Sequence, residues 1–193
     1  GLALLLVTLF FDFVHWVSAI GFMIGLWVIA SVAIELWRRW RGRLGITAGV
    51  AGMCLAHFGI GLFAIGVSGA AGYSIEKDVA LKPNAVFSIR GYDFKFIDTH
   101  PVRGPNYDAV QATVQISRHG QLIATLQPQK RHYWARGAEQ TEAGISVGWT
   151  RDLFVALGDD LGGGAWSMRL QYKPFIRYIW LGALVMALGG IVA

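Results

Sequence analysis

Two kinds of hydropathy pattern follow one another along this chain. Three stretches are long and apolar enough for a membrane-spanning helix, which needs about 20 residues to cross a hydrocarbon core about 30 Å thick. They are residues 14–37, 46–71 and 175–193, and residues 1–11 have the composition of the end of a preceding helix. The pattern therefore predicts a membrane α-helical bundle fragment with about three transmembrane helices.

Between residues 72 and 174 the pattern changes to short segments in which apolar and polar residues alternate. Such alternation, bounded by Gly, Pro and Asn, is typical of β-strands. The segment predicts six to eight antiparallel strands in an inserted all-β domain, either a small barrel or a two-sheet sandwich. Turns are expected where Gly or Asn can supply a positive φ, at Lys82–Asn84, Gly104–Asn106, His119–Gly120 and Asp159–Gly164.

Composition places the chain among integral membrane proteins. Hydrophobic residues make up 54% of the 193 and charged residues 15%, and the mean hydropathy is +0.47, so the apolar content is above that of an ordinary soluble domain. The chain begins at Gly1 without a methionine and ends at Ala193 inside an apolar run, so we expect a C-terminal piece of a longer polypeptide. The first run lacks a basic segment and a small-residue cleavage site, which argues against a cleaved signal peptide.

Four arginines set the expected orientation. Arg38, Arg39, Arg41 and Arg43 lie in the link 38–45 between the first two spans, and short arginine-rich loops stay in the cytoplasm. Transmembrane helices are therefore expected within residues 1–71, a periplasmic β-domain at 72–174 and a C-terminal transmembrane helix at 175–193. We expect a multi-pass protein of the bacterial inner membrane.

Charge and motifs exclude several classes of function. The formal net charge is +5, but residues 72–174 carry 12 basic against 10 acidic residues, so nothing indicates nucleic-acid binding. Cys54 is the single cysteine and lies in the second span, which excludes an internal disulfide. Hydrolase, P-loop, zinc-protease and C-x-x-C motifs are absent from the sequence.

His57 is the most informative residue of the chain. It lies eleven positions after Ile46, which places it about 16 Å into the membrane. Ionisable side chains at that depth are costly and indicate function, and a neutral imidazole there is a candidate ligand of a metal or a haem iron. Gly61, one turn further along, leaves space through which a flat porphyrin could approach.

A structural role for His57 is the alternative. Ala48, Gly52, Ala56, Gly59 and Gly66 could form a small-residue helix interface across which the imidazole only hydrogen-bonds. The residues alone leave both interpretations open.

The second ligand of a six-coordinate haem is not found in this sequence. His15 lies at the opposite end of the first span, about 33 Å from the inner face, so it cannot share an iron with His57. Met53 and Cys54 are too near His57 along the helix to reach the other side of a haem. A second ligand is expected from a helix outside this chain.

The outer segment offers weaker candidates. His100, His119 and His132 have no metal-ligand spacing. Residues 130–134, a basic and aromatic cluster, could hold a haem propionate or a partner protein, or could be a solvated strand end. Arg177, near the third span, is a candidate contact for a haem propionate or a lipid phosphate.

Several motifs, in a fixed order, resemble one known family. They are GMCLAHFG at 52–59, YSIEKDV at 73–79, GPNY at 104–107, PQKRHY at 128–133, TEA at 141–143, RDLFVALG at 151–158, GAW at 164–166 and KPFIRYIW at 173–180. Together they are similar to the C-terminal third of CcmF, the haem lyase (synthetase) component of system I cytochrome c maturation. Gln129 departs from the glutamate usual at its position, so no acid role is expected there.

The resemblance implies that His57 is one axial ligand of a membrane haem b. It also implies that the tryptophan-rich haem-handling motif and its two flanking histidines precede Gly1, so the catalytic residues stay unknown here. The whole protein would take haem from the chaperone CcmE. With CcmH/CcmI-type proteins presenting apocytochrome c, it would then promote thioether attachment of that haem.

The membrane haem would act as an electron relay, with quinol as a candidate donor and membrane lipid around the helices. Two other functions stay open: a membrane anchor or interaction module with a structural His57, and a membrane cytochrome b without lyase activity. The motifs do not separate the general maturation protein from its nitrite-reductase-dedicated paralogue.

Overall fold

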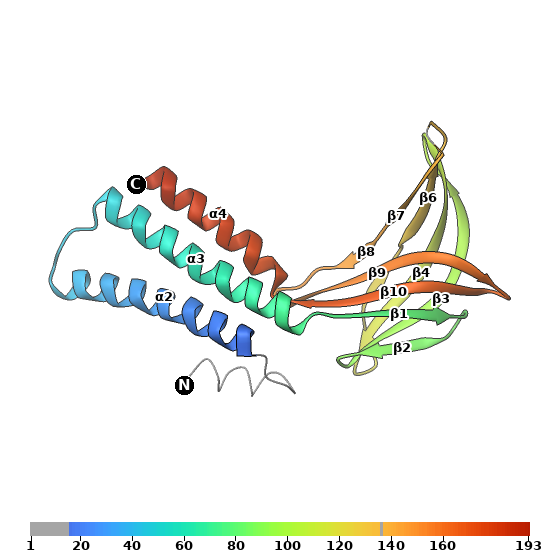
Figure 1. The fold of residues 1–193 in the computed structure, drawn as a ribbon, viewed down its shortest axis with the longest axis horizontal. Helices are drawn as coiled ribbons and strands as arrows, with labels where there is room; N and C mark the ends of the chain where they lie inside the picture. The colour runs from blue at the N-terminus through green and yellow to red at the C-terminus, as the bar shows by residue number, and fades with distance from the viewer. Residues whose placement is uncertain (1–15, 136) are drawn as a thin grey trace. The chain divides into compact units, whose positions relative to one another are not determined.

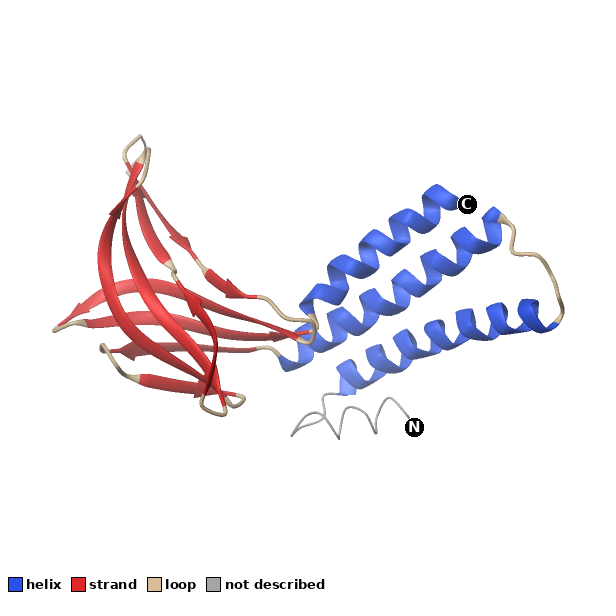
Figure 2. Ribbon diagram, turned by 180° about the vertical axis from the view of Figure 1, so that it is seen from behind, coloured by secondary structure: helices blue, strands red, loops and turns tan. Residues whose placement is uncertain are grey.

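The computed structural model describes residues 16–135 and 137–193, which form two compact units (Figures 1 and 2). The first unit contains the helices α2 (Trp16–Arg41), α3 (Ala48–Tyr73) and α4 (Ile176–Val192). The second contains the strands between residues 75 and 172. The expected end of an earlier helix at residues 1–11, and His15, lie outside the described residues.

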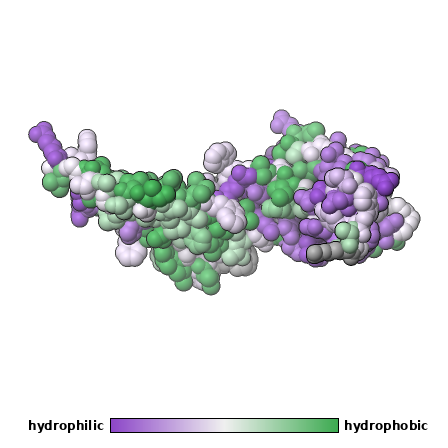
Figure 3. Space-filling view, turned by 90° about the horizontal axis from the view of Figure 1, so that it is seen from above, coloured by the Kyte–Doolittle hydropathy of each residue, from purple (hydrophilic) through white to green (hydrophobic). Residues whose placement is uncertain are grey.

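Two of the helices have the length and composition of membrane spans. α2 and α3 have 26 residues each and are apolar enough to cross a membrane, while α4 is apolar but has 17 residues. Large apolar side chains on their outer surfaces are exposed, including Trp27 and Leu184 at 71% and 64%, and hydrophobic residues cover much of the visible helical surface (Figure 3). A helix satisfies its own backbone hydrogen bonds, so such a surface is suited to lipid.

The link between α2 and α3 is shaped by local chemistry. Arg38, Arg39 and Arg41 occupy the last turn of α2, where positive charge complements the partial negative charge of the helix end. Thr47 caps α3, because its side chain accepts a hydrogen bond from the Val50 backbone N–H at 3.4 Å. The basic link therefore connects two helices whose boundaries are well defined.

Glycines bring α3 and α4 into backbone contact. Gly52, Gly59 and Gly66 recur every seven residues on α3, and Gly182 and Gly189 do so on α4. A Cβ at position 59 would lie 2.6 Å from the Met186 backbone nitrogen and 2.7 Å from the Gly182 carbonyl oxygen. The two antiparallel helices can approach this closely only because hydrogen atoms occupy these positions.

The strands form two antiparallel sheets (Figure 2). One sheet has the order β1-β10-β9-β8, and the other has the order β2-β3-β4-β6-β7 with β5 paired to β4. Their bounds are β1 Ile75–Leu81, β2 Val86–Ile89, β3 Tyr92–Arg103, β4 Tyr107–Arg118, β5 Gln121–Leu126, β6 Gln129–Tyr133, β7 Ala138–Glu142, β8 Gly144–Ser146, β9 Arg151–Gly162 and β10 Ala165–Pro174. The two-sheet alternative among the predicted architectures is confirmed.

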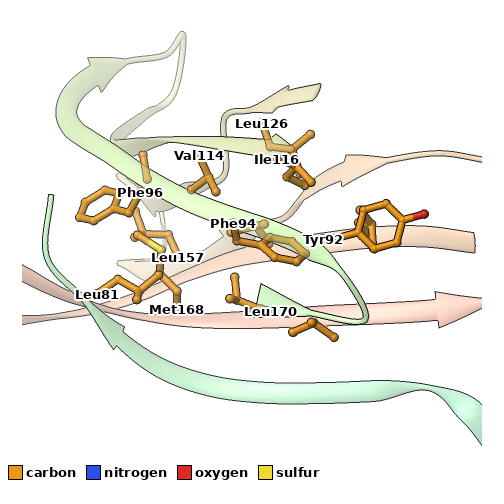
Figure 4. Packing of buried hydrophobic residues seen from close by; sticks show 14 residues of the cluster. Leu81, Tyr92, Phe94, Phe96, Val114, Ile116, Leu126, Leu157, Met168 and Leu170 are labelled. Atoms are coloured by element: carbon orange, nitrogen blue, oxygen red, sulfur yellow. The ribbon is translucent and has the colours of Figure 1, made fainter. Parts of the chain in front are cut away.

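The inner faces of the two sheets make one hydrophobic core (Figure 4). Phe94, Phe96 and Val114 come from the larger sheet, Leu157 and Leu170 come from the smaller one, and all five are completely buried. They occupy alternate positions on their strands, as expected for strands with one face in the core.

The predicted number of strands was too low, since ten are present among the described residues. The long segment from residue 85 to 98 is a hairpin of β2 and β3, turning at Arg90 and Gly91 with φ of 52° and 75°. These values suit a two-residue turn, and His119–Gly120 makes another with φ of 51° and 76°. The strands β6, β7 and β8 are short and lack clear alternation, and every residue of β7 is exposed.

Replacing one glycine at the α3–α4 contact should weaken the helical unit. Gly59→Ala places a methyl group against the α4 backbone and is expected to lower the free energy of unfolding by about 1–3 kcal/mol. The control is Gly49→Ala on the same helix, where a Cβ meets nothing within 4 Å among the described residues. Thermal unfolding in detergent measures both, and equal effects of the two substitutions would contradict this account.

Candidate functional site

His57 lies on the third turn of α3 with one ring nitrogen already engaged. Its Nδ1 is 2.8 Å from the backbone carbonyl oxygen of Met53, one turn earlier. A carbonyl can only accept a hydrogen bond, so Nδ1 carries the proton and Nε2 keeps its lone pair. Metal-binding histidines commonly donate their second N–H to a backbone carbonyl in this way.

The imidazole lines a cavity of about 510 Å³ between α2 and α3. That volume lies within the range of small-molecule and cofactor sites. The wall is mainly apolar and includes one face of α3, because Met53 and Cys54 each lie three or four residues from both Val50 and His57. The opposite wall consists of α2 residues: Trp27, Val28, Ser31, Val32, Glu35 and Arg39.

An ion pair lies at one end of this cavity. The Arg39 Nε donates to the Glu35 Oε1 at 2.6 Å, one turn away on α2, and the side chains are 25% and 35% exposed. Arg39 Nη1 also donates to the Gly45 carbonyl oxygen at 3.3 Å. Neither Glu35 nor Arg39 was predicted from the sequence to line a site, although the spacing of four residues between an acid and a base in an apolar helix was a usable signal.

The small-residue interface and His57 occupy different sides of α3. Gly52, Gly59 and Gly66 contact α4, whereas His57 faces the cavity shared with α2. A small-residue helix interface of the kind considered for a structural His57 is therefore present between α3 and α4. The hydrogen bond between His57 Nδ1 and the Met53 carbonyl lies within α3 rather than across that interface.

Two predicted cofactor contacts lie away from this cavity. A Cβ on Gly61 would meet Ile29 Cγ1 at 2.5 Å and the Gly25 carbonyl oxygen at 2.9 Å, so this glycine packs against α2. Arg177 is in the first turn of α4 and is not among the described residues that line the cavity. Their roles toward a haem stay predictions, and the structure gives Gly61 a packing role.

The outer histidines do not assemble a metal site. Within the described residues, His, Cys, Asp and Glu side chains form no group of three that could hold a metal ion. The His100 Nε2 is 3.2 Å from the Gln111 Nε2, and the Gln111 Oε1 accepts from Gln129 at 2.6 Å. Gln129 therefore acts as a hydrogen-bond donor inside the larger sheet, a role that an ionised glutamate cannot fill.

The basic and aromatic cluster at 130–134 is paired within the β-unit. Lys130 bonds Asp159 at 2.5 Å and Glu139 at 3.1 Å, and these carboxylates raise the pKa of Lys130 above its usual value. Arg131 lies over the Tyr107 ring, with its guanidinium carbon 4.6 Å from the ring centroid. The cluster therefore makes ion pairs and a ring contact with other strands of the β-unit, and its role toward a propionate or a partner protein stays a prediction.

Comparison with known proteins identifies the family. The family model described as "CcmF C-terminal beta-sandwich" matches residues 72–174, more than half of the chain. The chain belongs to the CcmF family. Because the matched range is the predicted β-domain, the family assignment and the two-sheet fold describe the same residues.

Relatives named for cytochrome c biogenesis support this assignment. The chain is 38% identical over 192 residues to "Cytochrome c-type biogenesis protein CcmF" of Pseudomonas aeruginosa, covering 96% of this chain and 29% of that protein. It is 39% identical over 190 residues to the Escherichia coli K12 protein of the same name, covering 98% and 29%. The chain thus spans less than a third of the length of these CcmF relatives.

A solved structure titled "Cytochrome c Heme Lyase CcmF" has the same fold. The TM-score is 0.81 with 19% identity, and the match covers 99% of this chain and 33% of that one. The fold of this chain is therefore already known from a solved structure.

One exposed ion pair connects the edge strand of the smaller sheet to its neighbour. Arg169 on β10 donates from Nε and Nη2 to the two Asp78 oxygens on β1 at 2.8 and 3.1 Å, and it lies 3.1 Å from Glu76. The hydrogen bond from Arg169 and its charge hold the pKa of Asp78 below its ordinary value of 3.8. Asp78 and Arg169 lie opposite each other in the β1–β10 pairing, so this ion pair joins the two strands at that position.

Asp78→Asn should show how this pair depends on pH. The folded-state pKa of Asp78 is lowered, so the pair stabilises the folded protein above pH 3.8 and the effect is lost as pH falls through the lowered pKa. We expect the variant to unfold at a lower temperature than the parent near neutral pH, with the difference closing in acid. Circular dichroism of the strands measures this, and an equal difference at about pH 7 and about pH 2 would contradict it.

Proposed function

We propose that this chain is the part of a CcmF haem lyase that forms one side of a membrane b-type haem site, with His57 as an axial ligand. The observation that carries the proposal is the state of the imidazole. Its Nδ1 is bonded to the Met53 carbonyl at 2.8 Å, and its ring lines a largely apolar cavity of about 510 Å³. A proton on Nδ1 leaves Nε2 as the nitrogen that can ligate iron.

The remaining residues of the cavity fit a haem. Trp27, Val28, Val32 and Val50 supply an apolar wall, which suits a porphyrin ring. Bis-histidine ligation closes both axial positions to substrate and suits electron transfer, the chemistry that the haem would supply. His57 would then position one face of the group, and the helices would exclude water from it. The second ligand is expected from residues outside this chain.

The whole protein is proposed to act in cytochrome c maturation. It would take haem from the chaperone CcmE and attach it through thioether bonds to apocytochrome c presented by CcmH/CcmI-type proteins. The membrane haem would relay electrons into that reaction, with quinol as a candidate donor. The names of the relatives support this role, because the Pseudomonas and Escherichia proteins are both called cytochrome c-type biogenesis protein CcmF.

The proposed membrane topology is based on the distribution of arginines along the chain. The basic link 38–45 is proposed to lie on the cytoplasmic side of the bacterial inner membrane, with the β-unit in the periplasm. The β-unit would act as a docking or bracing module, since its buried residues form a structural core and no metal cluster is found in the described part of the chain.

Substitution of His57 tests the haem site. In the full-length protein purified in detergent, His57→Ala is expected to lose most of the reducible b-type Soret absorbance, because one axial bond is removed. The control is Cys54→Ala, which changes a side chain lining the same cavity without removing a ligand. The measurement is the ratio of haem to protein together with the reduced-minus-oxidised spectrum.

Two results would favour other functions. An unchanged spectrum in a folded His57→Ala protein would assign this histidine a structural role, as in a membrane anchor. A parent protein that carries the haem but fails to restore cytochrome c production in cells lacking CcmF would indicate a membrane cytochrome b without lyase activity.

A further inference from the structure

One arginine of the basic link differs from the others in its surroundings. Arg39 lines the cavity that contains His57, whereas Arg38, Arg41 and Arg43 are not among its described lining residues. Arg41 instead lies over the Trp37 ring, with its guanidinium carbon 4.9 Å from the ring centroid. Cytoplasmic orientation requires only positive charge in the link, so it does not explain why one guanidinium lies in an apolar cavity.

The hydrogen bonds of Arg39 leave part of its guanidinium available. Nε donates to Glu35 at 2.6 Å and Nη1 donates to the Gly45 carbonyl at 3.3 Å. A guanidinium has five N–H donors, so the bonds described for Arg39 use two of them and leave three, including both on Nη2. Such a planar group is well suited to a second carboxylate.

The position of Arg39 along the cavity matches the dimensions of a haem. Arg39 is two residues before the end of α2, and His57 is nine residues after the start of α3. Since the antiparallel helices are joined by a short link, a rise of 1.5 Å per residue places the two residues about 10 Å apart along the helix axes. The separation between a haem iron and its propionate carboxylates is of the same order.

We propose that Arg39 binds a propionate carboxylate of the haem that His57 ligates, and that Glu35 holds the guanidinium in place. The proposal rests on the haem ligation proposed above. It orients the propionate edge of the porphyrin toward the 38–45 link. It also supplies a charge partner for a carboxylate that would otherwise be costly to place among apolar side chains.

The ion pair then has a measurable effect on the haem iron. Positive charge on Arg39 favours the reduced iron, which carries one positive charge fewer, and negative charge on Glu35 favours the oxidised iron. The two side chains are therefore expected to shift the midpoint potential in opposite directions. A residue that only holds the helix ends together would not produce such a signed pair of shifts.

Redox titration of the full-length protein tests this. Arg39→Gln is expected to reduce the ratio of reduced to oxidised haem at fixed potential about tenfold, a downward shift of about 59 mV for one electron. Glu35→Gln is expected to raise the ratio, and Arg39→Lys, which keeps the charge, should retain most of the parent value. The matched control Arg41→Gln removes an equal charge from the same link and should change the ratio less than Arg39→Gln.

A ligand-side experiment separates a propionate contact from a general charge effect. Apoprotein is reconstituted with haem or with haem dimethyl ester, whose propionates carry no charge. The Arg39→Gln protein should bind haem about tenfold more weakly than the parent protein does. The two proteins should bind the ester with similar affinity. An equal loss for both compounds, or no change in potential, would overturn the proposal. Unchanged binding of both compounds would favour lipid phosphate as the anion bound by Arg39.

The two proposals fail in different ways. If His57→Ala keeps the haem spectrum, or if the parent protein contains no haem, the ligation proposal fails and the propionate contact falls with it. If His57→Ala loses the spectrum while Arg39→Gln leaves the potential and the haem affinity unchanged, only the propionate contact is overturned.

Discussion

The close approach of the α3 and α4 backbones determines which side of α3 remains available for other contacts. Gly59 and Gly182 lie at the centre of this contact, and a Cβ on either would overlap backbone atoms of the other helix. Successive residues of an α-helix are turned by about 100°, so His57 lies about 200° around α3 from Gly59. The contact with α4 therefore leaves the imidazole on the side that borders α2. A packing requirement on one side of the helix thus sets the direction of the chemical group on the other.

The elements that could be predicted from the sequence are those marked by a hydrophobic period or an apolar composition. The helices at α2 and α3 and the alternating strands with large core residues, such as Phe94 and Phe96, followed from patterns of hydrophobicity alone. The resemblance to CcmF then supplied the family, which the comparisons confirm. The sequence could not indicate which face of one helix packs against which neighbouring helix. Gly61, for which porphyrin access stays a prediction, packs against Ile29 of α2, and the pattern of a single helix does not specify which partner helix covers a given glycine.

The short polar strands show a second limit of sequence patterns. β7 is exposed at every position, so no alternation marks it, and it is a strand because β6 provides backbone partners. Charged residues in the β-unit also pair across strands, as Lys130 does with Asp159 and Arg169 does with Asp78. These partners are far apart in sequence, so the sequence alone does not indicate which charged side chains pair.

The hydrogen bond from His57 to the Met53 carbonyl has a consequence for the order of events at this site. The bond is made within one helix, so the imidazole tautomer and ring rotation are set as soon as α3 forms. A ligand arriving later need not select among rotamers or move a proton between ring nitrogens, and that conformational cost is met during folding. Under the proposed ligation of iron by His57, preorganisation of this kind would leave the imidazole ready for the metal before the other residues of the haem site are in place.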